Sequence, residues 1–175
     1  TRKLKFLIPL IIILIIPTQA GLLYEFYSRP AFAKISQQEL SALKFVKDNT
    51  GSNDVIITPP YNQYLNLGGV TPNIWDWFDT SYVSAFSSRR TYMDDYEQND
   101  IMGYVWRGRM TLKENLFKEV NPNIFKVIID EIGSQIIYFP KAVRPAVDLT
   151  KAGLTKVFEN SEVEVWKIDQ NIQPL

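Results

Sequence analysis

The N-terminus most restricts how this chain can fold, because a run of uncharged, mostly aliphatic residues at 6–23 follows three cations. The cations are Arg2, Lys3 and Lys5, and the next basic residue is Arg29. A helix rising about 1.5 Å per residue can cross a hydrocarbon layer with such a run. Positive charge favours the cytoplasmic side. We therefore predict one span in the cell membrane, with the residues after about position 27 on the extracytoplasmic side.

A cleavable signal peptide is the alternative interpretation of the same run. The basic start, the apolar stretch and the small-residue sequence PTQA at 17–20 fit a cleavage site. Against cleavage, apolar residues continue to Leu23, and Tyr24, Phe26 and Tyr27 are typical of the aromatic belt of a membrane helix. We favour a retained helix, and both alternatives export the rest of the chain. Because the sequence begins with Thr, we also expect it to be a piece of a longer protein.

Composition excludes several classes of function. Nineteen basic and nineteen acidic residues give zero net charge, which removes the electrostatic case for a nucleic-acid partner. The chain has no Cys, and hence no disulfide, thiolate metal site or cysteine nucleophile. It also has no His, the commonest general base and metal ligand. We therefore expect no catalytic residue, metal site or cofactor within this chain.

The exported part is predicted to be one α/β domain. We divide the chain into a membrane helix with its flanks at 1–27, a linker at 28–35, the domain at 36–169 and a frayed tail at 170–175. Ser36 and Glu39 form a capping-box pattern that starts the first domain helix, and a buried strand is expected at 54–58. Further helices are expected at 111–120, 122–132 and 145–152, and further strands at 89–93, 135–139, 154–159 and 163–168.

This order of elements predicts the fold class. We expect a small α/β sandwich with mainly parallel central strands and a C-terminal antiparallel hairpin. The segment 61–88 shows no clear periodicity and is rich in aromatic residues. Long irregular segments inside a compact domain are often functional, so we look for a binding site there.

Aromatic and acidic residues in this segment suggest carbohydrate binding. The sequence Trp75-Asp76-Trp77 is typical of a sugar platform, on which rings stack against the sugar and a carboxylate accepts hydroxyl hydrogens. Tyr61, at the start of the segment, is included in the candidate site. The alternative is that these aromatic residues anchor a long loop to the core or to lipid headgroups.

Basic residues at the end of the segment suggest anion binding. A guanidinium at Arg89 or Arg90 is suited to a phosphate or carboxylate, and Tyr92 follows them in the expected strand. The alternative is a salt bridge to Asp94 or Asp95. An acidic cluster at 94–100 lacks the ligand spacing of an EF-hand, so we interpret it as a solvated loop.

The order of five short motifs resembles one family. The motifs are KFVKDNT at 44–50, DVIIT at 54–58, VSAFSSRRTY at 83–92, QIIY at 135–138 and LTKVFENSEVEVWKI at 154–168. Together with the preceding apolar helix, this succession resembles the C-terminal extracytoplasmic domain of polytopic GT-C-type membrane glycosyltransferases. The resemblance covers roughly residues 4–169. Ser88 stands where that family usually has a Gly before the Arg.

The resemblance implies an accessory role. In that family, acidic residues in the first extracytoplasmic loop transfer sugar from a polyprenyl-phosphate donor, and that region lies outside this chain. The chain would then shape access of the donor or acceptor without itself catalysing the transfer. Its implied partners are the lipid bilayer, the remaining transmembrane segments of its parent protein and a lipid-linked sugar. The resemblance also allows a divalent metal in the full transferase. The alternative is a stand-alone, membrane-anchored or secreted interaction module without enzymatic activity.

Overall fold

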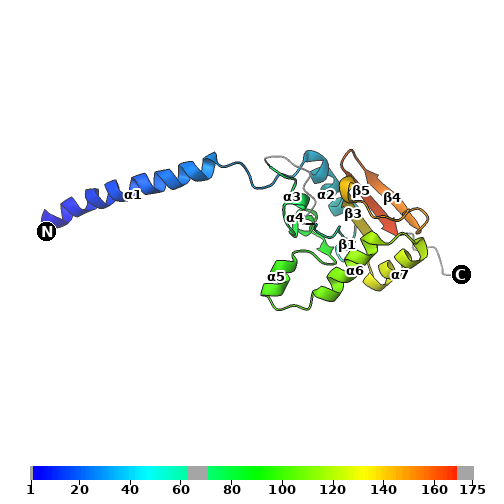
Figure 1. The fold of residues 1–175 in the computed structure, drawn as a ribbon. Helices are drawn as coiled ribbons and strands as arrows, with labels where there is room; N and C mark the ends of the chain where they lie inside the picture. The colour runs from blue at the N-terminus through cyan, green and yellow to red at the C-terminus, as the bar shows by residue number, and fades with distance from the viewer. Residues whose placement is uncertain (1, 63–70, 169–175) are drawn as a thin grey trace.

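A long N-terminal helix stands apart from a folded domain in the computed structural model, which describes residues 2–62 and 71–168 (Figure 1). The helix α1 spans Arg2–Ser28 and includes Pro9 and Pro17. Its segment Ile11–Ser28 is long and apolar enough to cross a membrane. Large apolar side chains along that segment are exposed, so no part of the domain covers them. The expected frayed tail at 170–175 lies outside the described residues.

The domain contains a mixed five-stranded sheet in the order β2-β1-β3-β5-β4. The strands are β1 (Val55–Ile57), β2 (Arg90–Thr91), β3 (Ile136–Pro140), β4 (Leu154–Glu159) and β5 (Val163–Ile168). The strands β2, β1 and β3 are parallel, whereas β5 is antiparallel to both β3 and β4. The predicted α/β class, the parallel strands and the C-terminal hairpin are all confirmed.

Helices cover both faces of the sheet and bury two separate cores. Successive residues of a strand point to opposite faces. Ile56 and Tyr138 therefore pack against α2 (Gln37–Asn49) and α4 (Tyr82–Ser87) on one face. Ile57 and Phe139 pack against α6 (Arg107–Lys118) and α7 (Pro122–Ile132) on the other. The domain is thus a three-layer α/β/α sandwich.

Local sequence signals account for the ends of several helices. The Ser36 hydroxyl accepts the Glu39 N–H at 3.0 Å, which starts α2 as predicted. The Asn121 side chain caps α7, and Gly133 ends that helix with a φ of 70°. The second half of the expected capping box is absent, however. Glu39 is buried and its carboxylate accepts the Tyr138 O–H instead of returning to Ser36.

Other elements differ from the sequence-based predictions. The segment expected to be irregular contains the short helices α3 (Ile74–Trp77) and α4, and α5 (Tyr96–Ile101) follows β2. The helix predicted at 145–152 is wrong, because that segment forms turns after the 3₁₀ helix η1 (Lys141–Val143). Val147 and Leu149 are both buried, and this two-residue alternation suits an extended segment rather than a helix.

The linker between α1 and the domain is short and is attached to α3. Lys34 pairs with Asn73 as an isolated parallel bridge, through its N–H to the Pro72 carbonyl and its carbonyl to the Ile74 N–H. The ring of Phe32 stacks on Trp77 at 6.1 Å between centroids. The predicted linker at 28–35 is therefore anchored to the domain over its second half.

The two edges of the sheet are interrupted. One edge strand, β2, is only two residues long. The other, β4, has a register shift between Lys156 and Phe158, which is a β-bulge or irregularity in its pairing with β5.

Candidate functional site

The carboxyl ends of the three parallel strands meet at one end of the sheet. We call this end the carboxyl edge, as distinct from the edge strands β2 and β4. The chain leaves β1 through α3 and α4 to reach β2 on one side, and it leaves β3 to reach β4, beyond β5, on the other side. The chain therefore turns in opposite directions from the adjacent strands β1 and β3. In open α/β sheets, ligands bind at such a topological switch point.

A small cavity and a larger groove occupy this edge. The cavity has a volume of about 30 Å³, and the groove one of about 500 Å³. The segment Pro60–Asn62 lines both, so the two are neighbours. Other residues lining the cavity include Thr58, Trp75, Asp76, Asp79, Asp94 and Val143. Other residues lining the groove are Tyr96, Trp106, Met110, Glu114 and Lys118.

A buried ion pair adjoins the cavity through Asp94, which lines it. Thr58 directly follows β1, Asp94 lies just after β2, and α6 brings Lys113 between them. The Lys113 ammonium donates to the Met93 carbonyl and lies 3.3 Å from both Thr58 Oγ1 and Asp94 Oδ1. The Thr58 hydroxyl donates to the same carboxylate oxygen at 2.5 Å. These contacts satisfy one oxygen of Asp94.

The other oxygen of Asp94 has no hydrogen-bond partner among the described residues, although it is buried. Burial raises the pKa of Asp94, while the Lys113 ammonium and the neighbouring Thr58 and Thr91 hydroxyls act in the opposite direction. Thr80 Oγ1, from a residue that also lines the cavity, is likewise buried and has no partner in the part of the chain that the structure describes. A buried polar atom without a partner costs free energy, so these two atoms are poised to meet a polar ligand group or water.

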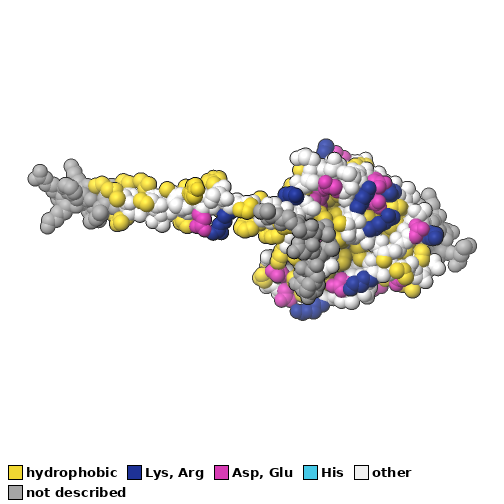
Figure 2. Space-filling model, turned by 45° about the horizontal axis from the view of Figure 1, so that its top comes forward, with side chains coloured by type: hydrophobic (Ala, Val, Ile, Leu, Met, Phe, Trp, Pro, Cys, Tyr) yellow, Lys and Arg dark blue, Asp and Glu magenta, His cyan; other side chains and the backbone are white. Residues whose placement is uncertain are grey.

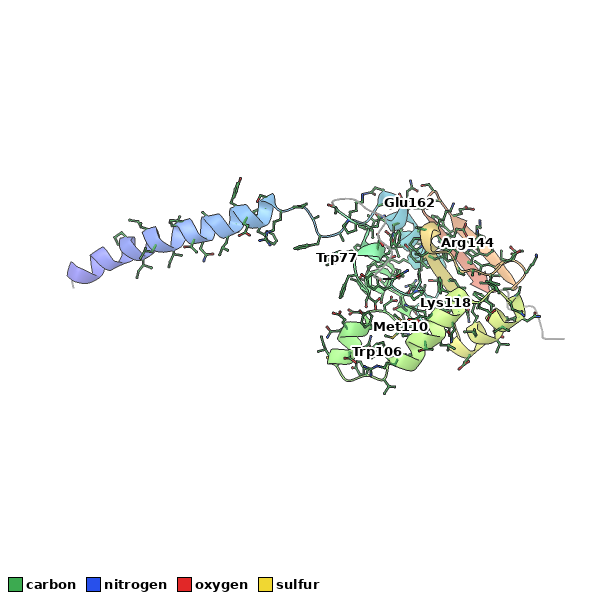
Figure 3. The ribbon with its side chains drawn as sticks, viewed as in Figure 1. Trp77, Trp106, Met110, Lys118, Arg144 and Glu162 are labelled. Carbon is green, nitrogen blue, oxygen red and sulfur yellow. The ribbon has the colours of Figure 1, made fainter. Side chains whose placement is uncertain are left out.

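Aromatic residues form the walls of the groove. Tyr96 and Trp106 lie with their ring centroids 5.4 Å apart, and the Trp106 indole N–H donates to Asp100 at 2.9 Å. Figure 3 shows Trp106, Met110 and Lys118 arranged along the start and length of α6. The buried carboxylate of Asp79 accepts the Tyr96 N–H at 2.8 Å and so fixes the start of α5. The walls are therefore held by hydrogen bonds before any ligand binds.

Three of the residues predicted from the sequence lie together at this edge. Tyr61, Trp75 and Asp76 line the cavity, and the Tyr61 hydroxyl donates to the Trp77 carbonyl at 3.2 Å. Trp77 itself is 43% exposed and faces the linker through its stack with Phe32. Figure 3 places Trp77 at the end of the domain that the linker enters.

The structure does not bring Arg89 and Arg90 to the same edge. Arg90 pairs with Val55 where β2 and β1 begin, at the amino ends of the strands. The Arg89 guanidinium donates to Thr50 Oγ1 at 2.9 Å, to the Thr50 carbonyl at 2.8 Å and to the Lys47 carbonyl. Arg89 therefore binds the C-terminal end of α2, where helix carbonyls lack partners.

Tyr92 belongs to neither group. Its N–H continues the sheet by donating to the Ile56 carbonyl at 2.9 Å, and its ring packs against the core beneath α6 and α7. The Arg109 guanidinium lies 5.7 Å from the ring centroid. Burial raises the pKa of its hydroxyl.

A second buried polar cluster touches the cavity from the α2 side. The Glu39 carboxylate accepts the Tyr138 O–H at 3.3 Å, and Tyr82 is its other tyrosine neighbour. Burial raises the pKa of Glu39 to about 7, although the hydrogen bonds from Tyr82 and Tyr138 oppose this shift. Tyr82 also lines the cavity. Tyr82 thus lies between the Glu39 carboxylate and the cavity.

Sequence reasoning did not single out Lys113, Thr58 or Trp106. A signal for Lys113 was present, because it lies three and four residues before the core positions Leu116 and Phe117 and therefore on the same face of α6. A lysine in an apolar stripe is buried only with a partner. The identity of that partner, Asp94, depends on tertiary structure.

No protein-family model matches the chain, and no curated protein matches it significantly. The chemistry of the site must therefore be inferred from its geometry. Among the described residues, no group of three acidic side chains is arranged to hold a metal ion. The site instead combines aromatic faces with hydrogen-bond acceptors, and this combination suits a ligand rich in C–H surface and hydroxyl groups.

Proposed function

We propose that this chain is a membrane-anchored accessory domain that binds carbohydrate at the carboxyl edge of its parallel strands. One observation carries the proposal: Tyr61, Tyr96 and Trp106 line an open groove next to a cavity that contains the half-satisfied carboxylate of Asp94. The groove volume of about 500 Å³ lies within the usual range for small-molecule sites, roughly 300–1,000 Å³.

Each half of the site has a distinct task in this proposal. The aromatic rings of the groove stack against the C–H faces of a sugar. The free Asp94 oxygen and Thr80 Oγ1 accept or exchange hydrogen bonds with hydroxyl groups that reach the cavity. Lys113 keeps Asp94 in place but lies beneath it, where it is fully buried and does not meet the ligand.

The apolar helix and the family resemblance support a biological setting for this binding. We propose that α1 crosses the cell membrane and that the domain is extracytoplasmic, next to the other membrane segments of a GT-C-type glycosyltransferase. The catalytic acidic residues, and any divalent metal, belong to the rest of that enzyme. The domain then receives the sugar of a polyprenyl-phosphate donor or its acceptor. The length of the open reading frame upstream of Thr1 separates this setting from a stand-alone module.

Calorimetric titration tests the binding. The full chain in lipid nanodiscs is titrated with a panel of hexose disaccharides, and we expect saturable binding by at least one. Replacing Tyr61 by Ala should weaken that binding about tenfold, which corresponds to about 1.4 kcal/mol. The matched control is Phe86→Ala, because Phe86 is an exposed aromatic residue of α4 that lines neither the cavity nor the groove.

Two outcomes would contradict the proposed site. One is the absence of saturable binding by every member of the panel. The other is an equal loss of affinity for Tyr61→Ala and Phe86→Ala, which would place the binding outside the groove.

A further inference from the structure

An exposed apolar turn joins α5 to α6. We call it the α5–α6 tip and define it as Ile101, Met102, Gly103, Tyr104 and Val105. The four large side chains are 77%, 58%, 62% and 94% exposed, in chain order. Neighbouring exposed apolar side chains of this kind mark interaction surfaces in soluble domains.

The α5–α6 tip is a folded feature and not a loose loop. The Gly103 N–H donates to the Asp100 carbonyl at 3.1 Å, and the Tyr104 N–H donates to the Asn99 carbonyl at 2.9 Å. Gly103 provides the positive φ of 73° that this turn requires. The backbone is therefore satisfied internally while the apolar side chains project outward.

A basic residue adjoins the tip. Arg107 begins α6, its side chain is largely exposed, and it lies 3.3 Å from Asp100 in an exposed ion pair. Exposed pairs of this kind are weak, so the guanidinium can exchange Asp100 for another anion. Apolar side chains next to an exposed Arg match the interfacial layer of a bilayer, where acyl chains lie below anionic phosphate groups.

The tip lies at the end of the domain nearest to α1. Figure 1 shows α3 and α5 at that end, whereas α7 lies at the far end. In Figure 2, apolar side chains follow α1 and continue onto the adjoining end of the domain. Tyr61 joins the two regions, because it bonds to Trp77 of α3 and lines the groove that contains Trp106.

The linker limits how far this end can move from the membrane. The helix α1 ends at Ser28, and Lys34 is already bonded to the domain. Six peptide steps span at most about 20 Å, even when fully extended. If α1 crosses a bilayer, the end of the domain that contains α3 must remain within that distance of the helix end.

We propose that the α5–α6 tip inserts into the interfacial layer of the bilayer that α1 crosses, with Arg107 meeting lipid phosphate. The domain is then attached to the membrane at two places, α1 and the tip, and the groove between the Pro60–Asn62 segment and α6 opens close to the lipid surface. This inference rests on the membrane anchorage in the proposed function, but not on carbohydrate binding.

Site-specific fluorescence tests the insertion. The chain has no Cys, so a single V105C or V127C substitution gives a unique labelling site. Both variants are labelled with an environment-sensitive dye, and the full chain is reconstituted in vesicles of phosphatidylcholine and phosphatidylglycerol. The label at 105 should shift its emission to shorter wavelength and be quenched by lipid-borne quenchers. The label at 127 should remain in water, because Val127 is 65% exposed on the distant helix α7.

Each alternative outcome overturns the insertion in a recognisable way. Equal, water-like emission from both labels means that the tip stays in solvent. A shift at 105 that disappears when the vesicles are made protein-poor means that a second copy of the chain covers the tip. A chain that does not float with vesicles contradicts the membrane anchorage and the insertion together. Loss of disaccharide binding with normal quenching at 105 contradicts the carbohydrate site alone.

Discussion

Each nitrogen of the Arg89 guanidinium donates a hydrogen bond, and two of the three nitrogens donate to the region where α2 ends. The acceptors are Thr50 Oγ1, the carbonyls of Lys47 and Thr50, and the carbonyl of Ser88. Carbonyls in the last turn of a helix have no partner within the helix, and a cation there also offsets the negative end of the helix dipole. Arg89 thus joins α2 to the start of β2.

Removing this side chain should destabilise the domain. We expect Arg89→Ala to lower the free energy of unfolding by about 1–3 kcal/mol, because carbonyls at the end of α2 lose a charged donor. The matched control is Arg90→Ala, whose guanidinium makes a single 3.4 Å contact with the Asn53 carbonyl. A surface change of that kind should stay within about 0.5 kcal/mol. Denaturant unfolding of the full chain in detergent micelles, followed by tryptophan fluorescence, measures both.

Disaccharide binding separates this structural role from the ligand role that the sequence suggested for Arg89. Arg89→Ala that remains folded should bind as the unmodified chain does, since the residue lies at the amino ends of the strands. A specific loss of affinity without loss of stability would contradict the structural role.

Contacts between neighbours in sequence were predictable at single residues, and contacts between distant residues were not. The caps at Ser36 and Asn121 depend on positions two or three residues away, so the sequence contains the whole interaction. Arg89 and Lys113 have partners 39 and 55 residues away, at Thr50 and Thr58. Residue type alone made Arg89 a candidate for binding phosphate. In the folded chain its guanidinium instead donates to backbone carbonyls.

At the scale of elements, Glu39 connects α2 to the sheet and to α4. Its carboxylate lies against Tyr138 of β3 and Tyr82 of α4 inside one of the two cores. Burial raises its pKa from 4.5 to about 7. At moderately acid pH, Glu39 is thus neutral in the folded chain but ionised in the unfolded chain.

This difference makes the packing of α2 depend on pH. Between about pH 4.5 and 7 the folded state binds more protons at Glu39 than the unfolded state, so the free energy of unfolding falls as the pH rises through this window. The decrease levels off above pH 7 and amounts to at most about 3 kcal/mol for this shift. Glu39→Gln retains a neutral polar group and should have a much flatter profile.

Unfolding at several pH values between 4.5 and 8 measures the effect. The control is Glu131→Gln, an exposed carboxylate on α7, which should leave the profile of the unmodified chain intact. Parallel profiles for Glu39→Gln and the unmodified chain would mean that Glu39 is ionised in the folded state.

Elements with a strong periodic pattern were predictable, and short ones were not. The helices α2 and α7 have both a cap and an apolar stripe, and β3 is an unbroken apolar run. The helices α3 and α4 have four and six residues, too few for a periodic pattern to emerge. At 145–152, Pro145 and Gly153 suggested a helix, but Val147 and Leu149 enter the core as an extended segment does.

The whole molecule is asymmetric in charge about its apolar helix. Arg2, Lys3 and Lys5 precede the apolar segment of α1, whereas Arg29 follows it. Because cations favour the cytoplasmic side, a reporter fused after Leu175 should be active only outside the cytoplasm. Parallel fusions to alkaline phosphatase and to a cytoplasm-dependent fluorescent protein measure the side directly.

Charge reversal provides the control for this prediction. Replacing the three leading cations by Glu should reduce the fraction of chains with the domain outside. Activity of the cytoplasmic reporter alone in the unmodified chain would contradict the orientation.

The fold class was predictable for the whole domain, because the order of helices and strands along the chain indicates parallel strands joined by helices. The location of the site was predictable only in part. An aromatic segment directly follows β1 in the sequence, and this position correctly predicted that Tyr61, Trp75 and Asp76 lie at the carboxyl ends of the strands. The groove wall at Tyr96 and Trp106 follows from how α5 and α6 fold back over the end of β2, which no local pattern specifies.

The interrupted edge strands of the sheet affect whether neighbouring copies of the domain can pair when many copies share one surface. If α1 anchors the domain in a membrane, copies diffuse in two dimensions and meet with a restricted set of orientations, so exposed strand edges would encounter one another often. A two-residue β2 offers almost no ladder to extend, and the irregular pairing at Lys156 and Phe158 disturbs the opposite edge. Lateral crowding can therefore increase without the sheets joining into fibres.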